Sequence, residues 1–195
     1  MERASAYDQS FEDARSRLLD LFKSRALFFG NFTLASGKQS TYYINSKKAI
    51  FNAEALWLMG EVIYQMTRTM NLQALGGPEV GAIPMATAAA MRYHEHGQSM
   101  EAFYVRKQAK GHGSKEMVEG IVRPGDQVAI VEDVLTTGGS VLQAIQEVER
   151  LDARIAAVIC IVDRLEGARE ALDHYNFLPI FTIRDFGIEP PDKTI

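Results

Sequence analysis

Two adjacent acids precede a turn rich in glycines and hydroxyls near the middle of the chain. Glu132 and Asp133 follow the apolar run 128–131, and the residues after them are Val134, Leu135, Thr136, Thr137, Gly138, Gly139 and Ser140. Neighbouring carboxylates can accept hydrogen bonds from the vicinal hydroxyls of a sugar. The glycines allow a tight turn and a close approach of the backbone, and a helix that begins there offers free N–H groups to an anion. Segment 128–140 therefore predicts a site for a ribose 5-phosphate; the alternative is a capped strand–turn–helix without a ligand.

A second group of residues is basic and lies between glycines. Arg106, Lys107, Lys110 and His112 fall in the polar loop 107–117 or next to it. Together they could gather around a diphosphate, and in a net acidic chain they form the obvious local positive patch. The alternative is a solvated basic loop, which is the usual fate of such runs. Glycine on both sides of His112 favours a moving lid.

Three further segments carry groups that suit a ligand. Arg164 follows the apolar run 155–162, and its planar fork can bind both oxygens of a carboxylate; the alternative is a surface ion pair. Segment 76–84 is glycine-rich and predicts a strand-to-helix turn with backbone donors, or a plain connection. Segment 32–45 predicts short strands with aromatic packing and a turn at Ser36-Gly37.

The elements that must position these residues alternate between strand and helix. Apolar spacing predicts helices over 11–27, 53–70, 84–94, 140–151 and 166–175. Short apolar runs predict strands over 72–75, 102–105, 128–131, 155–162 and 179–183. This alternation indicates the α/β class, with a mainly parallel central sheet and helices on both faces. Ligands of such folds bind at the carboxyl ends of the strands.

Composition limits the classes of function. The chain has 195 residues, of which 47% are hydrophobic, as expected for a single domain with a real core. The net charge is −4, so no global basic field indicates a nucleic-acid partner. The single cysteine, Cys160, lies in an apolar run and is expected to be buried. We see neither an apolar leader nor a run of the ~18 residues that a membrane span needs, so we expect a cytoplasmic protein without a membrane partner.

The string V-A-I-V-E-D-V-L-T-T-G-G-S over 128–140 resembles the signature of the type I phosphoribosyltransferases. The resemblance implies that residues 132–140 bind phosphoribosyl diphosphate (PRPP), with Mg²⁺ held mainly through PRPP and by no protein side chain. It also implies the fold of that family, a flanked, mainly parallel sheet in one domain of residues 1–195. A small N-terminal hood would comprise about residues 10–50 plus C-terminal residues, and the core about residues 53–183.

Three other segments are similar to those of orotate phosphoribosyltransferases. The R-K-x-x-K-x-H-G pattern over 106–113 looks like that family's catalytic loop, segment 32–45 like its hood, and segment 76–84 like its pyrophosphate loop. The resemblance implies the transfer of phosphoribose from PRPP to orotate, giving orotidine 5′-monophosphate and diphosphate in de novo pyrimidine (UMP) biosynthesis. The implied catalytic residues are Arg106, Lys110, His112 and Asp133, and the first three also bind PRPP with Lys107. The implied orotate contacts are Tyr43, Ile44, Thr136 and Arg164.

The resemblance further implies a homodimer in which loop 107–117 reaches the neighbouring active site. The chain departs from the family at Ala35, where some members carry lysine, and at Val80-Gly81, where some carry tyrosine-lysine. More of the diphosphate binding would then fall to backbone amides, Mg²⁺ and the lid. Two alternatives stay open: a phosphoribosyltransferase for another base, such as a purine or uracil, and a PRPP-sensing regulator without catalysis. Arg164 and the basic loop favour orotate over the first, and the acidic balance disfavours the second.

Overall fold

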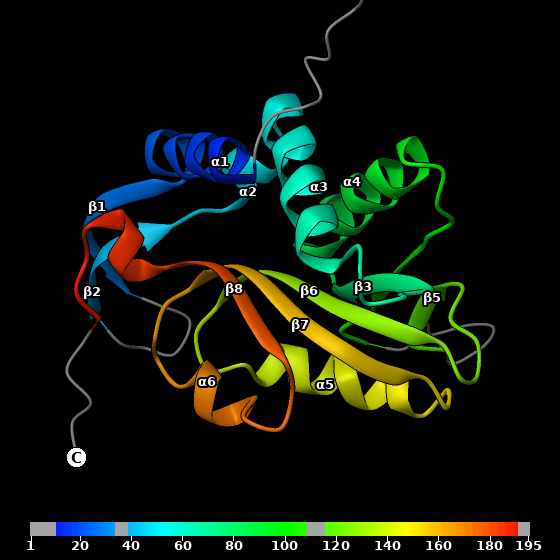
Figure 1. The fold of residues 1–195 in the computed structure, drawn as a ribbon. Helices are drawn as coiled ribbons and strands as arrows, with labels where there is room; N and C mark the ends of the chain where they lie inside the picture. Colours follow the sequence, from blue (N-terminus) through cyan, green and yellow to red (C-terminus); the bar gives the residue numbers. More distant parts are fainter. Residues whose placement is uncertain (1–10, 34–38, 109–115, 191–195) are drawn as a thin grey trace, which may run out of the picture.

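The computed structural model describes residues 11–33, 39–108 and 116–190, which form a central sheet, a separate hairpin and surrounding helices (Figure 1). The strands are β1 (Leu27–Thr33), β2 (Gln39–Ile44), β3 (Ala74–Pro78), β4 (Glu101–Val105), β5 (Val118–Gly120), β6 (Gln127–Leu135), β7 (Arg154–Asp163) and β8 (Phe177–Thr182). The helices are α1 (Phe11–Arg25), α2 (Lys47–Ile50), α3 (Ala53–Thr67), α4 (Ala82–Glu95), α5 (Gly139–Glu149), α6 (Ala168–Ala171) and the 3₁₀ helix η1 (Ile183–Phe186).

The central sheet has the strand order β5-β4-β3-β6-β7-β8. Only the short edge strand β5 is antiparallel to its neighbour, and the other pairings are parallel. From β3 the chain proceeds outward to β4 in one direction and then returns to β6, β7 and β8 in the other. The order thus reverses between β3 and β6, where folds of this class bind their ligands, outside the carboxyl ends of the strands. The α/β prediction is confirmed.

The apolar strands fill the core because they are covered on both faces. Figure 1 shows α3 and α4 on one side of the sheet and α5 and α6 on the other. Side chains alternate along a strand, so Ala129 and Val131 of β6 pack in the core on the α3 side, while Val128 and Ile130 pack in the core on the α5 side. Cys160 of β7 is a free, buried thiol in the second of these cores, as expected.

The N-terminal hairpin shares its core with the sheet. Leu18 and Phe22 of α1 lie in the same hydrophobic cluster as Ile159 of β7 and Phe186 of η1. Figure 1 shows η1 beside β1 and β2, so the end of the described chain returns to its beginning. Arg15 strengthens this junction by donating from Nε to the carbonyl of Ile180 at 3.1 Å. The division into a hood and a core stays a prediction, because a continuous hydrophobic cluster joins the two regions.

Several element boundaries differ from the sequence-based expectation. Strand β6 does not end at Val131 but continues to Leu135, because Glu132 and Val134 keep their register with β7. Strand β3 likewise includes Gly76–Pro78, which were expected to end it. The helix predicted over 166–175 is reduced to α6, which begins after Gly167 with its positive φ of 116°. The antiparallel edge strand and the short helices α2 and η1 were not predicted.

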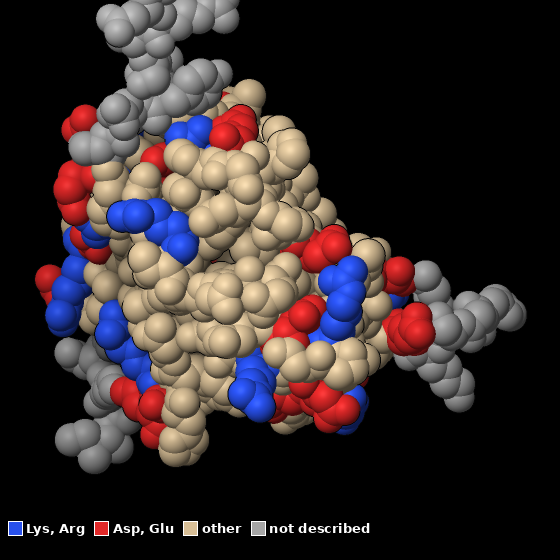
Figure 2. Space-filling model, turned by 45° about the vertical axis from the view of Figure 1, so that its right-hand side comes forward, with Lys and Arg blue, Asp and Glu red and all other residues tan. Residues whose placement is uncertain are grey.

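Charges of both signs are interspersed on the surface. In Figure 2, lysine and arginine side chains lie next to aspartate and glutamate side chains on the face shown, around a broad uncharged area. This arrangement agrees with the modest net charge of −4. Within residues 11–33, 39–108 and 116–190, no helix is both long enough and apolar enough to cross a membrane.

The glycines of β3 are required by the close approach of its neighbours. A Cβ at Gly76 would lie 2.1 Å from the carbonyl oxygen of Phe103, and one at Gly77 would lie 2.1 Å from that of Val131. We expect Gly76→Ala to lower the free energy of unfolding by about 3 kcal/mol, because backbone atoms of β4 would have to move. Denaturant unfolding measures this change. The matched control is Gly139→Ala, whose added Cβ would meet no atom within 4 Å, and an equal loss in the control would contradict the explanation.

Candidate active site

Four chain segments meet at the carboxyl edge of the sheet around the end of β6. The turn after β3 brings Gly81 against Asp133, since a Cβ there would lie 2.5 Å from the Asp133 Cγ. The segment after β7 is tied to β6 by the Arg164 N–H, which donates to the Leu135 carbonyl at 2.9 Å. From the N-terminal region, Ser46 donates a hydrogen bond to Asp133. The predicted sugar site therefore forms where the sheet order reverses.

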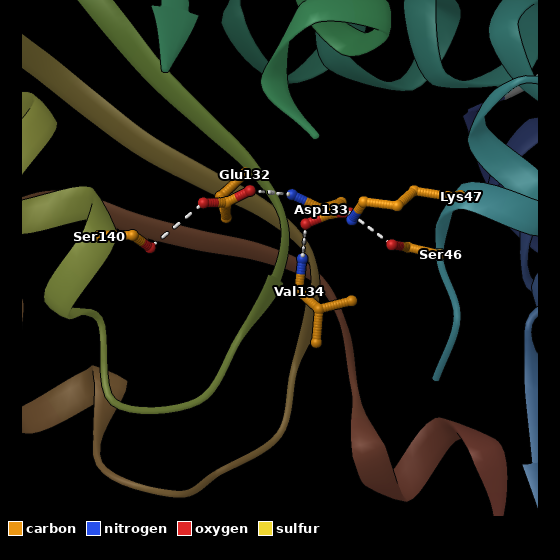
Figure 3. Close-up of polar contacts among 6 residues, drawn as sticks. All are labelled: Ser46, Lys47, Glu132, Asp133, Val134 and Ser140. Atoms are coloured by element: carbon orange, nitrogen blue, oxygen red, sulfur yellow. Dashed lines mark hydrogen bonds and ion pairs between the residues drawn. The ribbon is translucent and has the colours of Figure 1, made fainter. Parts of the chain in front are cut away.

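The two acids of β6 point to different sides of the strand. Glu132 accepts from Ser140 Oγ at 3.3 Å, at the start of α5, and from the Asp133 N–H at 3.1 Å. Asp133 Oδ2 accepts from Ser46 Oγ and lies 3.2 Å from the Lys47 ammonium, while Oδ1 accepts from the Val134 N–H at 2.9 Å (Figure 3). The acids were expected beyond the strand's end, but they belong to its ladder, and their side chains remain near enough to interact with each other.

Burial and hydrogen bonding shift the pKa values of these two acids in opposite directions. Burial, and then the negative charge of Asp133, hold the pKa of Glu132 well above its usual range. Burial would also raise the pKa of Asp133, but hydrogen bonds from Glu132, Ser46 and Lys47, with the charge of Lys47, outweigh it and lower that pKa. The pair therefore favours a proton on Glu132 and a negative charge on Asp133. A protonated Glu132 can donate as well as accept hydrogen bonds.

The turn after β6 has the features of an anion site. Gly138 has a φ of 84°, a left-handed conformation that glycine adopts without strain. Gly139 begins the 11-residue helix α5, and the space around its Cα is open. The first N–H groups of a helix have no partner inside it and are available to an anion. The Thr136 carbonyl accepts from the Ala168 N–H at 3.0 Å, which anchors the turn to α6.

Arg164 is buried on the other side of this turn. Its guanidinium lies over the ring of Tyr42 at 4.8 Å and is 2.8 Å from Glu166 Oε1 through Nη2. The Arg164 Nε and the Tyr42 hydroxyl are the two buried side-chain polar atoms, among described residues, that have no hydrogen-bond partner. Such orphaned groups are costly and mark sites where a ligand or an ion completes the bonding. Burial raises the pKa of Tyr42, so its hydroxyl stays a donor.

Strand alternation places neighbouring residues of β2 on opposite faces of the strand. Ile44 is buried in the hydrophobic core, and Tyr43 is on the opposite face, where its ring packs 5.6 Å from that of Phe32. Both were predicted near the base from the resemblance, and their contact with a base stays a prediction. Sequence reasoning missed Tyr42, the β2 residue that contacts Arg164. The available signal was its position two residues before Ile44, on the same face of the strand.

The base of the lid is held by the turn after β3. The Lys107 N–H donates to Glu79 Oε1 at 2.9 Å, so the two segments expected to bind diphosphate are in contact. Arg106 donates from Nε to the Gln108 carbonyl at 3.3 Å and lies 3.6 Å from Glu119. Lys110 and His112, and also Ala35, lie outside the described residues.

A protein-bound metal is not supported by the residues that the structure describes. They contain no group of three or more histidine, cysteine, aspartate or glutamate side chains that could hold an ion. Of the two acids at the site, Glu132 has a raised pKa because of its burial, and Asp133 is already bonded to Ser46 and Lys47. Neither carboxylate is therefore a ready ligand for a resident cation.

A reversed sheet order with an acidic strand end and a glycine turn before a helix suits a sugar phosphate, and the chain belongs to the phosphoribosyltransferases. Residues 49–191 match the family model described as the phosphoribosyl transferase domain. More narrowly, the chain belongs to the orotate phosphoribosyltransferase family. It is 42% identical over 178 residues to the orotate phosphoribosyltransferase of Thermococcus gammatolerans, a match that covers 89% of this chain and 92% of that protein.

Solved structures agree with this assignment. The Mycobacterium tuberculosis orotate phosphoribosyltransferase in complex with Fe(III) dicitrate superposes with a TM-score of 0.79 and 33% identity, covering 90% of this chain and 99% of that one. A structure of the M. tuberculosis enzyme in complex with PRPP gives a TM-score of 0.75 at 30% identity, with the same coverage. The resemblance inferred from the motifs is confirmed.

The raised pKa of Glu132 makes stability depend on pH. Below its ordinary pKa of 4.5 both the folded and unfolded states carry the proton. Above that value the unfolded state loses the proton first, so the contribution of Glu132 to stability falls as pH rises through its folded-state pKa. We expect Glu132→Gln to gain stability relative to the native protein as pH increases from about 4.5 towards 8. Thermal unfolding across this range measures the difference, with the exposed Glu189→Gln as the control. A constant difference would contradict the burial of an ionisable Glu132.

Proposed function

We propose that the protein transfers the phosphoribosyl group from PRPP to orotate, giving orotidine 5′-monophosphate and diphosphate in de novo pyrimidine (UMP) biosynthesis. The observation that carries the proposal is the buried Arg164 guanidinium, stacked on Tyr42 at the same sheet edge as the acidic pair. Family membership supports it, because the similar proteins named above are orotate phosphoribosyltransferases.

The base site suits a planar acid. A carboxylate is what distinguishes orotate from uracil, and an arginine fork can bind both of its oxygens. Glu166 pairs with Nη2 of Arg164, while Nε and the Tyr42 hydroxyl have no partner. Orotate can supply acceptors to both donors, with Thr136 as a second contact at the turn. A base without the carboxylate would leave the arginine unsatisfied in a buried site.

PRPP extends along the sheet edge from this base site. Glu132 and Asp133 bind the ribose hydroxyls, and residues 136–140 bind the 5-phosphate through backbone N–H groups and hydroxyls. The turn over 76–84 offers backbone amides to the diphosphate. Arg106, Lys107, Lys110 and His112 complete the cover from the lid.

Catalysis in this arrangement needs no side-chain nucleophile. A ring nitrogen of orotate attacks C1 of the ribose and gives up its proton to solvent or to the departing diphosphate, as the C1–O bond breaks and the departing oxygen takes the electron pair. The site accelerates this step by holding the reactants in line and by stabilising the negative charge that develops on diphosphate. Mg²⁺ bound with PRPP neutralises part of that charge. Closure of loop 107–117 excludes water, which would otherwise hydrolyse PRPP.

The proposal includes a homodimer. Loop 107–117 of one subunit would reach the active site of the other, so each site would need both chains. The anchoring of Lys107 by Glu79 supports a lid that begins at the diphosphate turn. A cytoplasmic location goes with this proposal, as the place where pyrimidine precursors are made.

A direct assay tests the reaction. The full-length protein is mixed with Mg²⁺ and PRPP and offered orotate, uracil or hypoxanthine, with orotate consumption followed by absorbance and the other products by chromatography. We expect kcat/KM for orotate to exceed that for the other bases by about a thousandfold or more, because a site built to bond a polar group rejects ligands that lack it. Comparable turnover of uracil or hypoxanthine would overturn the choice of base.

The role of Arg164 can be separated from a structural one. We expect Arg164→Ala to raise the KM for orotate about 10- to 100-fold, the usual worth of a hydrogen bond to a charged group, and to change the KM for PRPP by less than about threefold. Steady-state kinetics with each substrate varied in turn give both values. Arg184→Ala, which removes an exposed arginine, is the control. Equal increases in both KM values would make Arg164 a structural residue.

A further inference from the structure

A lysine from the N-terminal region lies at the ribose acid. Lys47, the first residue of α2, has its ammonium 3.2 Å from Asp133 Oδ2 (Figure 3). The Asp133 side chain is 9% exposed, whereas that of Lys47 is 56% exposed. A half-exposed ammonium therefore lies against a nearly buried carboxylate.

Asp133 does not need Lys47 to satisfy its oxygens. Ser46 donates to Oδ2 and the Val134 N–H donates to Oδ1. An ion pair with a half-exposed lysine contributes little to stability. An ionised carboxylate has about four acceptor positions, which Ser46, Glu132, Lys47 and the Val134 N–H occupy, so a ribose hydroxyl that bonds to Asp133 would take the position of the Lys47 ammonium. The contact therefore leaves the lysine available to a ligand.

The turn over 76–84, here called the diphosphate turn, contacts Asp133 through a glycine. Gly81 of the diphosphate turn packs against the carboxylate, and a Cβ there would lie 2.5 Å from Asp133 Cγ. Any side chain at position 81 would displace the acid, so this turn is limited to backbone donors at its closest point. Lys47, which belongs to another element, places a full positive charge next to the same Asp133 carboxylate.

The chemistry of the ligand connects these observations. A ribose hydroxyl that bonds to Asp133 lies about 2.7 Å from its carboxylate. When the C2 hydroxyl is the one that bonds to Asp133, the neighbouring carbon is C1, which carries the diphosphate. A flexible ammonium that contacts the same carboxylate then lies on the side of the ribose that carries the leaving group. We propose that Lys47 is a catalytic residue that binds the diphosphate of PRPP and stabilises its charge as it departs; this assignment rests on the proposed function.

The test separates charge from hydrogen bonding. Lys47→Gln keeps a donor for Asp133 but removes the charge, Lys47→Arg keeps both, and Lys48→Gln removes an exposed charge from the next residue of α2. Inorganic diphosphate and ribose 5-phosphate are titrated separately into each full-length variant by calorimetry with Mg²⁺ present, and PRPP kinetics are measured alongside. Thermal unfolding verifies that each variant is folded.

We expect Lys47→Gln to weaken diphosphate binding about tenfold or more and to change ribose 5-phosphate binding by less than about threefold, since a tenfold change corresponds to a single lost charge contact. Its kcat with PRPP should fall as well, because the contact strengthens in the transition state. Lys47→Arg should restore most of both, and Lys48→Gln should behave like the native protein.

Unchanged diphosphate affinity in Lys47→Gln, or an equal loss in Lys48→Gln, would overturn the assignment. Asp133→Asn distinguishes this failure from failure of the proposed function. If Asp133→Asn weakens ribose 5-phosphate binding and the native protein consumes orotate, a negative result at Lys47 concerns Lys47 alone. If Asp133→Asn binds ribose 5-phosphate normally, or orotate is not consumed, the proposed function itself is wrong.

Discussion

The burial of two carboxylates side by side in the central strand is the constraint on which the rest of the site depends. Glu132 and Asp133 remain in the β6 ladder, where water cannot solvate two negative charges. The fold shifts the two pKa values in opposite directions: burial raises that of Glu132, and hydrogen bonds from Glu132, Ser46 and Lys47 lower that of Asp133 against the effect of its own burial. The Asp133 carboxylate retains its charge at the point where a sugar would bind, and its hydrogen bonds hold it in one orientation.

This solution links the N-terminal region to the sheet. The donors to Asp133 come from α2, so the hairpin that precedes α2 has to dock over the carboxyl edge. The same docking brings Tyr42 of β2 under the Arg164 guanidinium, and the shared hydrophobic core of α1, β7 and η1 holds the assembly together. The proposed sites for the ribose and for the base therefore both depend on the packing of the N-terminal region against the sheet.

Close backbone approach is the second feature of the site. Gly76 and Gly77 let β3 lie between β4 and β6, and Gly81 lets the following turn contact Asp133. These glycines leave the diphosphate turn without a side chain at its closest point. In the proposed mechanism, the positive charge that such a turn lacks comes from other elements, namely Lys47 at the acid and the basic residues of loop 107–117. Because these positions are glycines, the positively charged side chains of the proposed site have to come from other elements.

The sequence by itself determined the class of fold and the family, and it singled out segment 128–140 and Arg164 as candidates, because these depend on local patterns: apolar strands, a glycine turn before a helix, and motif spacing. It did not determine how far β6 extends, which depends on register with β7. It also missed Tyr42 and Lys47, since their contacts join residues far apart in the chain, 86 positions apart for Lys47 and Asp133. Only tertiary packing decided those contacts and the division of charge between the two acids, because burial and donor geometry exist only in the folded chain.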